Sequence, residues 1–216
     1  MKNQTISLIY VLCHHPLVNR IIEKTLTEAH HRVCPFSTAK IEGAGQCECV
    51  LIIDTYSVER WLEITLRFGL MKRQPVVLLT SNLKNQEEEI RILHLGVRAI
   101  VPIANLENEL KPAVESVVAG RLWVRRNTLT EYVMRKGGPA RQAPVFTARE
   151  EQIIACLLDG LSNKEIGHLL GISPRTVKFH VANVLRKVQV RNRRDLRQLK
   201  KVPQQNPQLL YRAVGA

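Results

Sequence analysis

The sequence lacks an even set of cysteines, a secretory signal and any long apolar run. Its five cysteines cannot all pair, and no leader of basic and then apolar residues precedes them, which excludes a secreted, disulfide-stapled fold. No apolar run approaches the ~18 residues that a membrane-spanning helix needs. We therefore expect a cytoplasmic protein with reduced thiols that does not enter a membrane.

Motifs for catalysis and for metal binding are also missing. Histidines and cysteines cluster at positions 13–15 and 30–34, but without the paired spacing of structural zinc sites. The sequence shows no spacing of a nucleophile and its base and no phosphate-binding loop. We therefore expect a protein that is not an enzyme and that holds no metal and no cofactor.

The excess of positive over negative charge is confined to the C-terminal part of the chain. The net charge is +13, yet residues 1–120 hold 13 basic and 13 acidic side chains, and residues 121–216 hold 19 basic and 6 acidic ones. Basic surfaces attract nucleic acids and anionic membranes alike. The most basic helix carries few large apolar residues on its charged face, which favours nucleic acid as the partner.

Two short helices joined by a tight turn are predicted between Leu161 and Val190. Ser162 and Glu165 form a capping box, so a helix should begin at Asn163. Gly171 supplies the left-handed residue that ends this helix. Ser173 then caps a second helix whose first residue, Pro174, has no N–H to leave unpaired.

The second of these helices has two unlike faces. An apolar stripe predicts a buried side, formed by Val177, Val181, Val184, Leu185 and Val188. The opposite stripe contains no acidic residue and consists of Arg175, Lys178, Phe179, Ala182 and Arg186. A cationic face with small and apolar gaps suits the major groove of DNA. The alternative is an ordinary core helix with a solvated basic face.

From Phe146 to about Leu199 the sequence resembles the LuxR-type helix-turn-helix domain of NarL/FixJ transcription factors. The matching segments are FTAREEQIIACLLDG, LSNKEIGHLLGIS, PRTVKFHVANVLRKVQV and RNRRDL, and Thr147 with Glu150 forms a further capping box. The resemblance implies a small all-α domain of four helices over residues 145–202. It also implies that Asn163–Gly171 braces Pro174–Val188, which reads bases, and that Asn192–Lys201 makes dimer contacts.

The N-terminal half alternates short apolar runs with helical patterns. This order predicts an α/β domain with a doubly wound, parallel, five-stranded sheet, flavodoxin-like in topology, over residues 1–120. The expected strands are Ile6–Leu12, Val33–Phe36, Val50–Ile53, Val76–Leu79 and Ala99–Ile103. The expected helices are Leu17–Ala29, Val58–Phe68, Gln86–Leu95 and Leu106–Val118, while Ser37–Glu48 is either a helix or a loop.

This half resembles a response-regulator receiver domain through HPLV at His15–Val18, LIID at Leu51–Asp54, PVVLLTS at Pro75–Ser81 and GVRAIVPIANLENEL from Gly96. The resemblance aligns Asp54 with the phosphorylated aspartate and Thr80 with the hydroxyl residue that senses the phosphoryl group.

Two parts of a receiver are absent. Cys13 and His14 stand where receivers hold Mg²⁺ with acids, and Ile103 stands where they carry a lysine. We therefore expect a degenerate receiver that ordinary phosphorylation does not control. The alternative is a conventional response regulator phosphorylated at Asp54 by a sensor kinase.

Residues 121–144 read as a partly helical linker. Leu122–Arg135 is predicted as one helix, which Gly137-Gly138-Pro139 ends. Some regulators of the family bind cyclic di-GMP through a tryptophan followed by arginine at the end of the receiver, and Trp123, Arg125 and Arg126 offer a comparable pattern. The alternative is that Trp123 packs against the last receiver helix. Residues 203–216 are expected to form a flexible tail.

The sequence thus predicts a transcription regulator that binds double-stranded DNA as a homodimer, with RNA polymerase as a further expected partner. Base contacts are expected from Arg175, Lys178, Phe179 and Ala182, and phosphate contacts from Lys164, Thr176, Asn183, Lys187, Arg191 and Arg193. The signal that switches it, from a sensor kinase or from a small ligand, stays open.

Overall fold

Five parallel strands form the centre of the N-terminal domain. The computed structural model describes residues 7–36, 49–58, 61–71, 74–80, 86–136, 146–188 and 190–200. The strands are β1 (Leu8–Leu12), β2 (Arg32–Pro35), β3 (Cys49–Asp54), β4 (Val76–Thr80) and β5 (Val97–Pro102). They pair in parallel in the order β2-β1-β3-β4-β5. The predicted doubly wound, five-stranded sheet is therefore confirmed.

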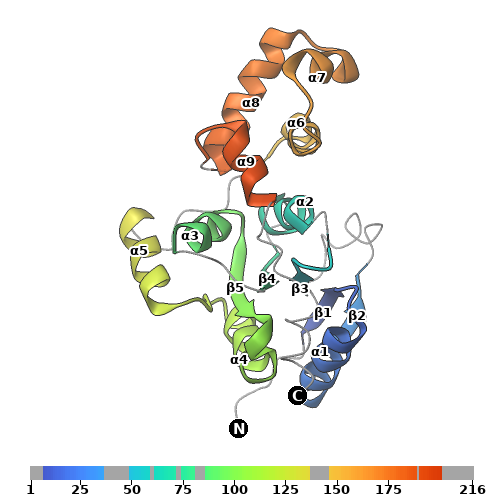
Figure 1. Ribbon diagram of the computed structural model, residues 1–216, viewed down its shortest axis with the longest axis vertical. Helices are drawn as coiled ribbons and strands as arrows, with labels where there is room; N and C mark the ends of the chain where they lie inside the picture. The colour runs from blue at the N-terminus through green and yellow to red at the C-terminus, as the bar shows by residue number, and fades with distance from the viewer. Residues whose placement is uncertain are drawn as a thin grey trace.

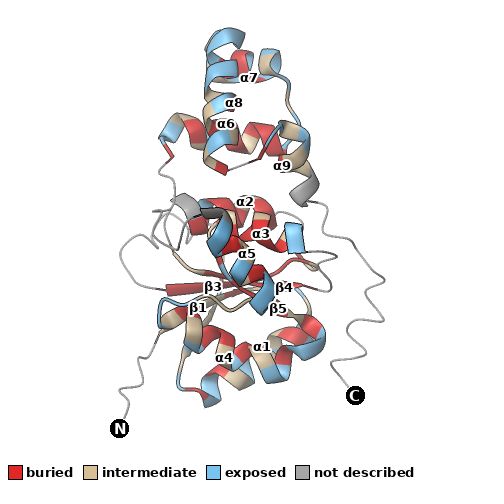
Figure 2. Ribbon diagram, turned by 90° about the vertical axis from the view of Figure 1, so that its left-hand side faces the viewer, coloured by how far each residue is buried: buried red, intermediate tan, exposed pale blue. Residues whose placement is uncertain are grey.

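Helices cover both faces of the sheet. The helices are α1 (Pro16–Glu28), α2 (Trp61–Thr65) with its π-helical continuation (Leu66–Met71), α3 (Gln86–His94) and α4 (Leu106–Val118), the last preceded by a 3₁₀ turn (Ile103–Asn105). Figure 2 shows α1 and α4 on one face and α2 and α3 on the other. Because both faces are covered, every residue of β3 and β4 is buried, as expected for a parallel sheet.

Several element boundaries differ from the prediction, and the last strand is an example. The strand expected to run from Ala99 to Ile103 begins earlier, at Val97, and Ile103 already belongs to the 3₁₀ turn that leads into α4. Ser37–Glu48, predicted as a helix or loop, lies outside the described residues, as does the predicted tail 203–216.

The π-helical segment after α2 lies against the turn between α3 and β5 with no room for a side chain. A Cβ atom on Gly96 would lie 2.7 Å from the carbonyl carbon of Gly69, and Gly96 has a φ of +91°. Both the close backbone approach and the positive φ require glycine here. The π-helical segment therefore packs directly on the backbone that leads into β5.

The linker packs against the N-terminal domain over its helical part. Trp123 forms a parallel bridge to Ala99 on the outer edge of β5, with its N–H donating to the Arg98 carbonyl over 2.9 Å. Helix α5 (Arg126–Lys136) follows and lies along α3, where the Thr128 hydroxyl donates to the buried Glu89 carboxylate. The predicted helix Leu122–Arg135 is thus shorter at its start, because its first residues bond to the sheet edge instead.

Four further helices form the C-terminal domain: α6 (Ala148–Leu158), α7 (Asn163–Leu170), α8 (Pro174–Val188) and α9 (Arg193–Lys200). Figure 1 shows them stacked beyond α2 at one end of the molecule. Both predicted capping boxes are present in full, at Thr147 with Glu150 and at Ser162 with Glu165. Within the described part of the chain, no helix has the length and apolar content needed to cross a membrane.

Candidate nucleic-acid interface

The turn between α7 and α8 has the geometry that its sequence predicts. Gly171 ends α7 with a φ of +64°, and the Ile172 N–H donates to the Gly167 carbonyl over 3.0 Å. The Ser173 hydroxyl then accepts the Thr176 N–H over 3.1 Å and so caps α8. These bonds hold α8 across α7 as a rigid helix-turn-helix.

Substituting Gly167 tests how tightly this turn is packed. A Cβ atom at Gly167 would lie 2.7 Å from the Ile172 carbonyl oxygen, within the backbone of the turn itself. Alanine in a helix normally gains about 1 kcal/mol over glycine, but overpacking here costs about 1–3 kcal/mol. We expect Gly167→Ala to destabilise the domain by up to about 2 kcal/mol in urea unfolding.

Gly171→Ala is the matched control for Gly167→Ala, because a Cβ atom there would meet nothing within 4 Å. Its cost is limited to the left-handed backbone, about 1 kcal/mol. A stabilised Gly167→Ala variant would show that the turn relaxes freely and does not fix α8.

Helix α8 presents one buried and one exposed side. Val177, Val181, Val184 and Val188 are buried and pack against α6 and α7. All four residues predicted to face bases are exposed, namely Arg175, Lys178, Phe179 and Ala182. Phe179 is 64% exposed, an unusual state for a large apolar side chain without a bound partner. We call the face formed by Arg175, Lys178, Phe179 and Ala182 the reading face of α8. Its side chains are accessible to a partner.

Four of the six residues predicted to contact phosphates remain on the rim of this face. Lys164 near the start of α7, Thr176 in the first turn of α8 and Arg191 after α8 are exposed, and Asn183 is partly exposed. The Thr176 hydroxyl already bonds the Ser173 hydroxyl, and the side-chain Oδ1 of Asn183 accepts from the Arg186 guanidinium over 3.3 Å.

The other two, Lys187 and Arg193, bond within the protein. The Lys187 ammonium lies 2.6 Å from the buried Glu150 carboxylate, whose side chain is 5% exposed, and 5.4 Å from the centre of the Phe146 ring. Arg193 donates to the Leu161 carbonyl and to the Asn163 side chain. Both cations therefore connect helices of the domain, and a contact with phosphate would compete with these internal bonds.

A second candidate site lies at the carboxyl ends of β1 and β3, where the strand order reverses and ligands bind in such sheets. Asp54 is 0% exposed. It accepts the Tyr56 N–H over 3.0 Å at one oxygen, and its other oxygen lies 3.4 Å from the Cys13 thiol, which donates. Burial, with the charge of Asp54, raises the pKa of the Cys13 thiol to about 12. Cys13 is therefore a neutral donor where receivers place a metal-binding acid.

The residues at the other aligned receiver positions are hydrogen-bonded or buried within the domain. His14 bonds Ser57 through its backbone N–H and its ring, each over 2.9 Å. Thr80 is buried at the end of β4, and Ile103 is buried among the side chains of α1 and α4. A hydrocarbon thus fills the place of the receiver lysine.

The three residues predicted to bind a cyclic dinucleotide do not form one cluster. Trp123 is half-buried, with its backbone bonded to β5 and its ring packed on the α1–α4 side of the domain. Arg125 lies 3.2 Å from the buried Glu89 carboxylate, and Arg126 is exposed at the start of α5. The ion pair already uses one of the two guanidinium groups that the ligand hypothesis requires.

Comparisons with known proteins agree with both halves of this structure. Residues 144–199 match the family model described as bacterial regulatory proteins of the luxR family. Over 144 residues the chain is 30% identical to the response regulator protein VraR of Staphylococcus epidermidis, and the alignment covers 67% of each chain. The chain belongs to the NarL/FixJ family of response regulators.

Other proteins match over less of their length or at lower identity. The HTH-type transcriptional regulator YhjB of Escherichia coli is 32% identical over 117 residues, so this chain spans 56% of that relative. The RcsB response regulator of Salmonella typhimurium aligns in structure with a TM-score of 0.46 and 20% identity, over 89% of this chain and 97% of that one.

Some contacts of this NarL/FixJ-family chain had no signal in its sequence pattern. Arg197 of α9 donates to the Gly160 carbonyl over 2.7 Å and to the Leu157 carbonyl over 3.4 Å, closing the end of α6. Helix α9, which the resemblance assigns to dimer contact, lies against α6 and α2 of its own chain.

Proposed function

We propose that this protein is a sequence-specific transcription regulator that binds duplex DNA through α8. The observation that carries this proposal is the exposed, acid-free stripe of Arg175, Lys178, Phe179 and Ala182, opposite a wholly buried valine stripe. A helix of this width and charge fits the major groove, where arginine and lysine read guanine and apolar groups read the thymine methyl. The +13 net charge supplies attraction to phosphates.

Lys164, Thr176, Asn183 and Arg191 would position α8 through the DNA backbone, since they border the reading face. Two copies would place two α8 helices in half-sites about one helical turn apart, as dimeric helix-turn-helix proteins do. RNA polymerase and a cytoplasmic location belong to the same proposal.

Selection from random duplexes tests this function directly. The full chain should enrich a short, partly symmetric sequence and bind it at least about 10³-fold more tightly than unselected duplex at physiological salt. Equal binding to selected and unselected DNA would show that the protein binds DNA through charge alone, and would contradict sequence-specific recognition.

We also propose that ordinary phosphorylation does not control the receiver-like domain. Phosphoryl transfer needs cations to neutralise developing charge. Here the metal-binding acid is replaced by a thiol whose pKa is near 12, and the lysine by the buried Ile103. Asp54 instead receives hydrogen bonds from Cys13 and Tyr56, which gives the carboxylate a structural role.

Acetyl phosphate with Mg²⁺ should therefore leave the intact mass of the protein unchanged. A phosphorylatable response regulator in the same tube shows that the donor is active. An added mass of about 80 Da, one phosphoryl group, that is lost in Asp54→Asn would restore the conventional response regulator.

Binding of a cyclic dinucleotide at Trp123, Arg125 and Arg126 stays a prediction. The Arg125–Glu89 ion pair and the docked backbone of Trp123 do not favour it, because a ligand would have to displace both.

A further inference from the structure

Helix α2 is buried on more sides than its contact with the sheet requires. Trp61, Leu62, Ile64, Leu66 and Phe68, on α2 and its π-helical continuation, are all buried, and so is the polar Thr65, while Glu63 and Arg67 are the charged positions. A helix that only covers a sheet has one apolar stripe. A helix that is apolar over most of its circumference has a second partner.

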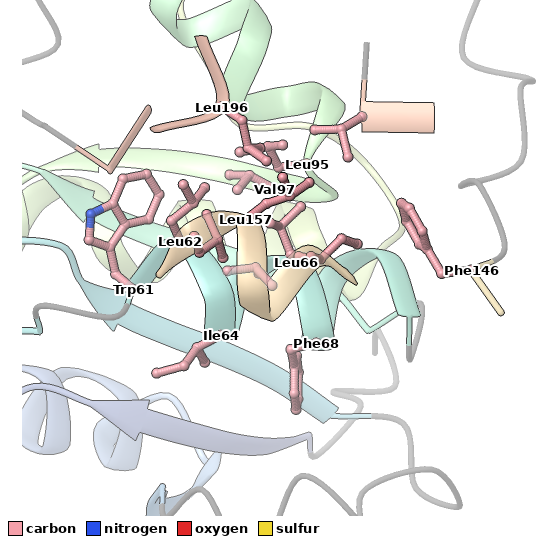
Figure 3. Packing of buried hydrophobic residues seen from close by; sticks show 14 of the residues in the cluster. Trp61, Leu62, Ile64, Leu66, Phe68, Leu95, Val97, Phe146, Leu157 and Leu196 are labelled. Carbon is pink, nitrogen blue, oxygen red and sulfur yellow. The ribbon is translucent and has the colours of Figure 1, made fainter. Parts of the chain in front are cut away.

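The two partners of α2 can be separated by residue pairs four positions apart. Ile64 and Phe68 point toward the strands, and Phe68 makes an edge contact with Phe36 at 5.9 Å between ring centres (Figure 3). Leu62 and Leu66 lie beside Leu157 of α6 in the same view, and α2 contacts both α6 and α9. The second partner is thus the C-terminal domain of the same chain.

The contact joins the cores of the two domains. Leu157 of α6 and Leu196 of α9 are fully buried, and they belong to one continuous apolar cluster with Trp61, Leu62 and Leu66. Separating the domains would expose large apolar side chains on both sides, which opposes separation. The contact also uses α6 and α9, so it leaves the exposed face of α8 uncovered.

We infer that the two domains engage DNA as one rigid body, with α2 seated on α6 and α9 throughout. This inference rests on the proposed DNA-binding function and adds that DNA occupancy is not gated by domain separation. Helix α2 braces the two helices behind α8, while the reading face stays open in the closed arrangement. A ligand shifts a closed–open equilibrium only if it binds one state better than the other. In the closed state, no described element covers the exposed face of α8.

The chain carries its own reporter of this contact. It has two tryptophans, Trp61 at the contact and Trp123 at the sheet edge, so Trp123→Phe leaves Trp61 as the single emitter. The probe is a labelled random-sequence duplex of about 30 base pairs, long enough for two half-sites, at about 50 mM salt, where nonspecific binding is strong. DNA anisotropy reports binding, and the emission maximum of Trp61 reports the contact.

We expect the anisotropy to rise to saturation while the Trp61 maximum stays at its buried, blue-shifted wavelength. A rise in anisotropy with a shift toward the emission of the urea-unfolded protein would overturn the rigid-body inference but leave DNA binding intact. No rise in anisotropy would reject the proposed function, and the inference with it.

A variant at the contact gives an independent measurement. Leu62→Gln should lower the free energy of unfolding of the two domains together, so that Trp61 emission and far-UV circular dichroism show the same transition. DNA affinity should stay unchanged or become weaker. Arg67→Gln, at an exposed position of the same segment, is the control. It should change the unfolding equilibrium constant and the DNA affinity by no more than about twofold. A gain in DNA affinity of about fivefold or more in Leu62→Gln alone would show gating by release.

Discussion

Replacing Lys178 with alanine is expected to weaken binding to the selected duplex by about 1–3 kcal/mol, roughly 5- to 150-fold, and to blur one base preference. Lys178 is exposed on the reading stripe of α8, one turn from Ala182, and no hydrogen bond or ion pair of its side chain holds it within the described residues. A lysine in the major groove donates to the acceptors of guanine. Its removal should therefore cost more on the selected sequence than on any other.

Lys164→Ala is the matched control, because it removes the same charge from the rim of the interface. Lys164 is exposed in the first turn of α7. In the proposed docking of α8, its side chain would reach phosphate and not base edges. This variant should weaken all duplexes about equally and reduce the slope of log affinity against log salt by about 1. Identical behaviour of the two variants over several sequences and two salt concentrations would contradict the assignment of α8 faces.

The local features of the DNA-binding domain were predictable because their causes are local. A capping box needs residues three apart, so Thr147 with Glu150 and Ser162 with Glu165 could be found in the sequence. Gly171 was predictable for the same reason, since a left-handed residue after a helix favours glycine. The buried and exposed faces of α8 followed from helical periodicity alone.

The partners of charged side chains were not predictable, because they lie far apart in the sequence. Lys187 falls on the flank of the basic stripe, and periodicity alone places it toward phosphate. Its partner Glu150 is 37 residues away, and Arg193 reaches Asn163 over 30 residues. A helical pattern gives the direction of a side chain but not the element that packs there. For the same reason, the packing of α2 against α6 and α9 could not be predicted. Apolar residues around most of a helix show that it is buried but not which element covers it.

The receiver-like domain shows a similar division. The strand ends placed Asp54 and Thr80 correctly at the carboxyl edge of the sheet, where topology requires them. The hydrogen bond from Cys13 to Asp54 depends on two strands that are 41 residues apart, and the sequence showed only that an acid was missing. The Trp123 bridge likewise depends on a free edge of β5, which strand order alone reveals.

Replacing Lys187 with methionine is expected to lower the free energy of unfolding by about 2–3 kcal/mol, since a buried carboxylate loses its partner. The side chain of Lys187 is 25% exposed, so solvent screens part of the ion pair and keeps the loss below the largest values for buried pairs. Arg186→Met removes one positive charge at the neighbouring exposed position. It should change stability by no more than about 0.5 kcal/mol in urea unfolding.

The pH dependence of this loss identifies Glu150 as the cause. Burial pushes the pKa of Glu150 up, but hydrogen bonds from Lys187 and Thr147 and the Lys187 charge outweigh it, so the pKa lies below its ordinary value of 4.5. The carboxylate therefore stabilises the fold above pH 4.5, and this contribution disappears as the pH falls through the folded-state pKa.

In Lys187→Met, burial acts with the main opposing charge and hydrogen bond removed, so the pKa of Glu150 should rise instead. Protonation of Glu150 then removes an unpaired buried charge from the variant and so raises its relative stability. In the native protein, the same protonation breaks a favourable ion pair and lowers the free energy of unfolding. The stability gap between the two should narrow as urea unfolding is repeated from about pH 7 toward pH 4, the range in which a glutamate titrates. A gap that stays constant over this range would assign the stabilising role of Lys187 to its contact with Phe146 and not to Glu150.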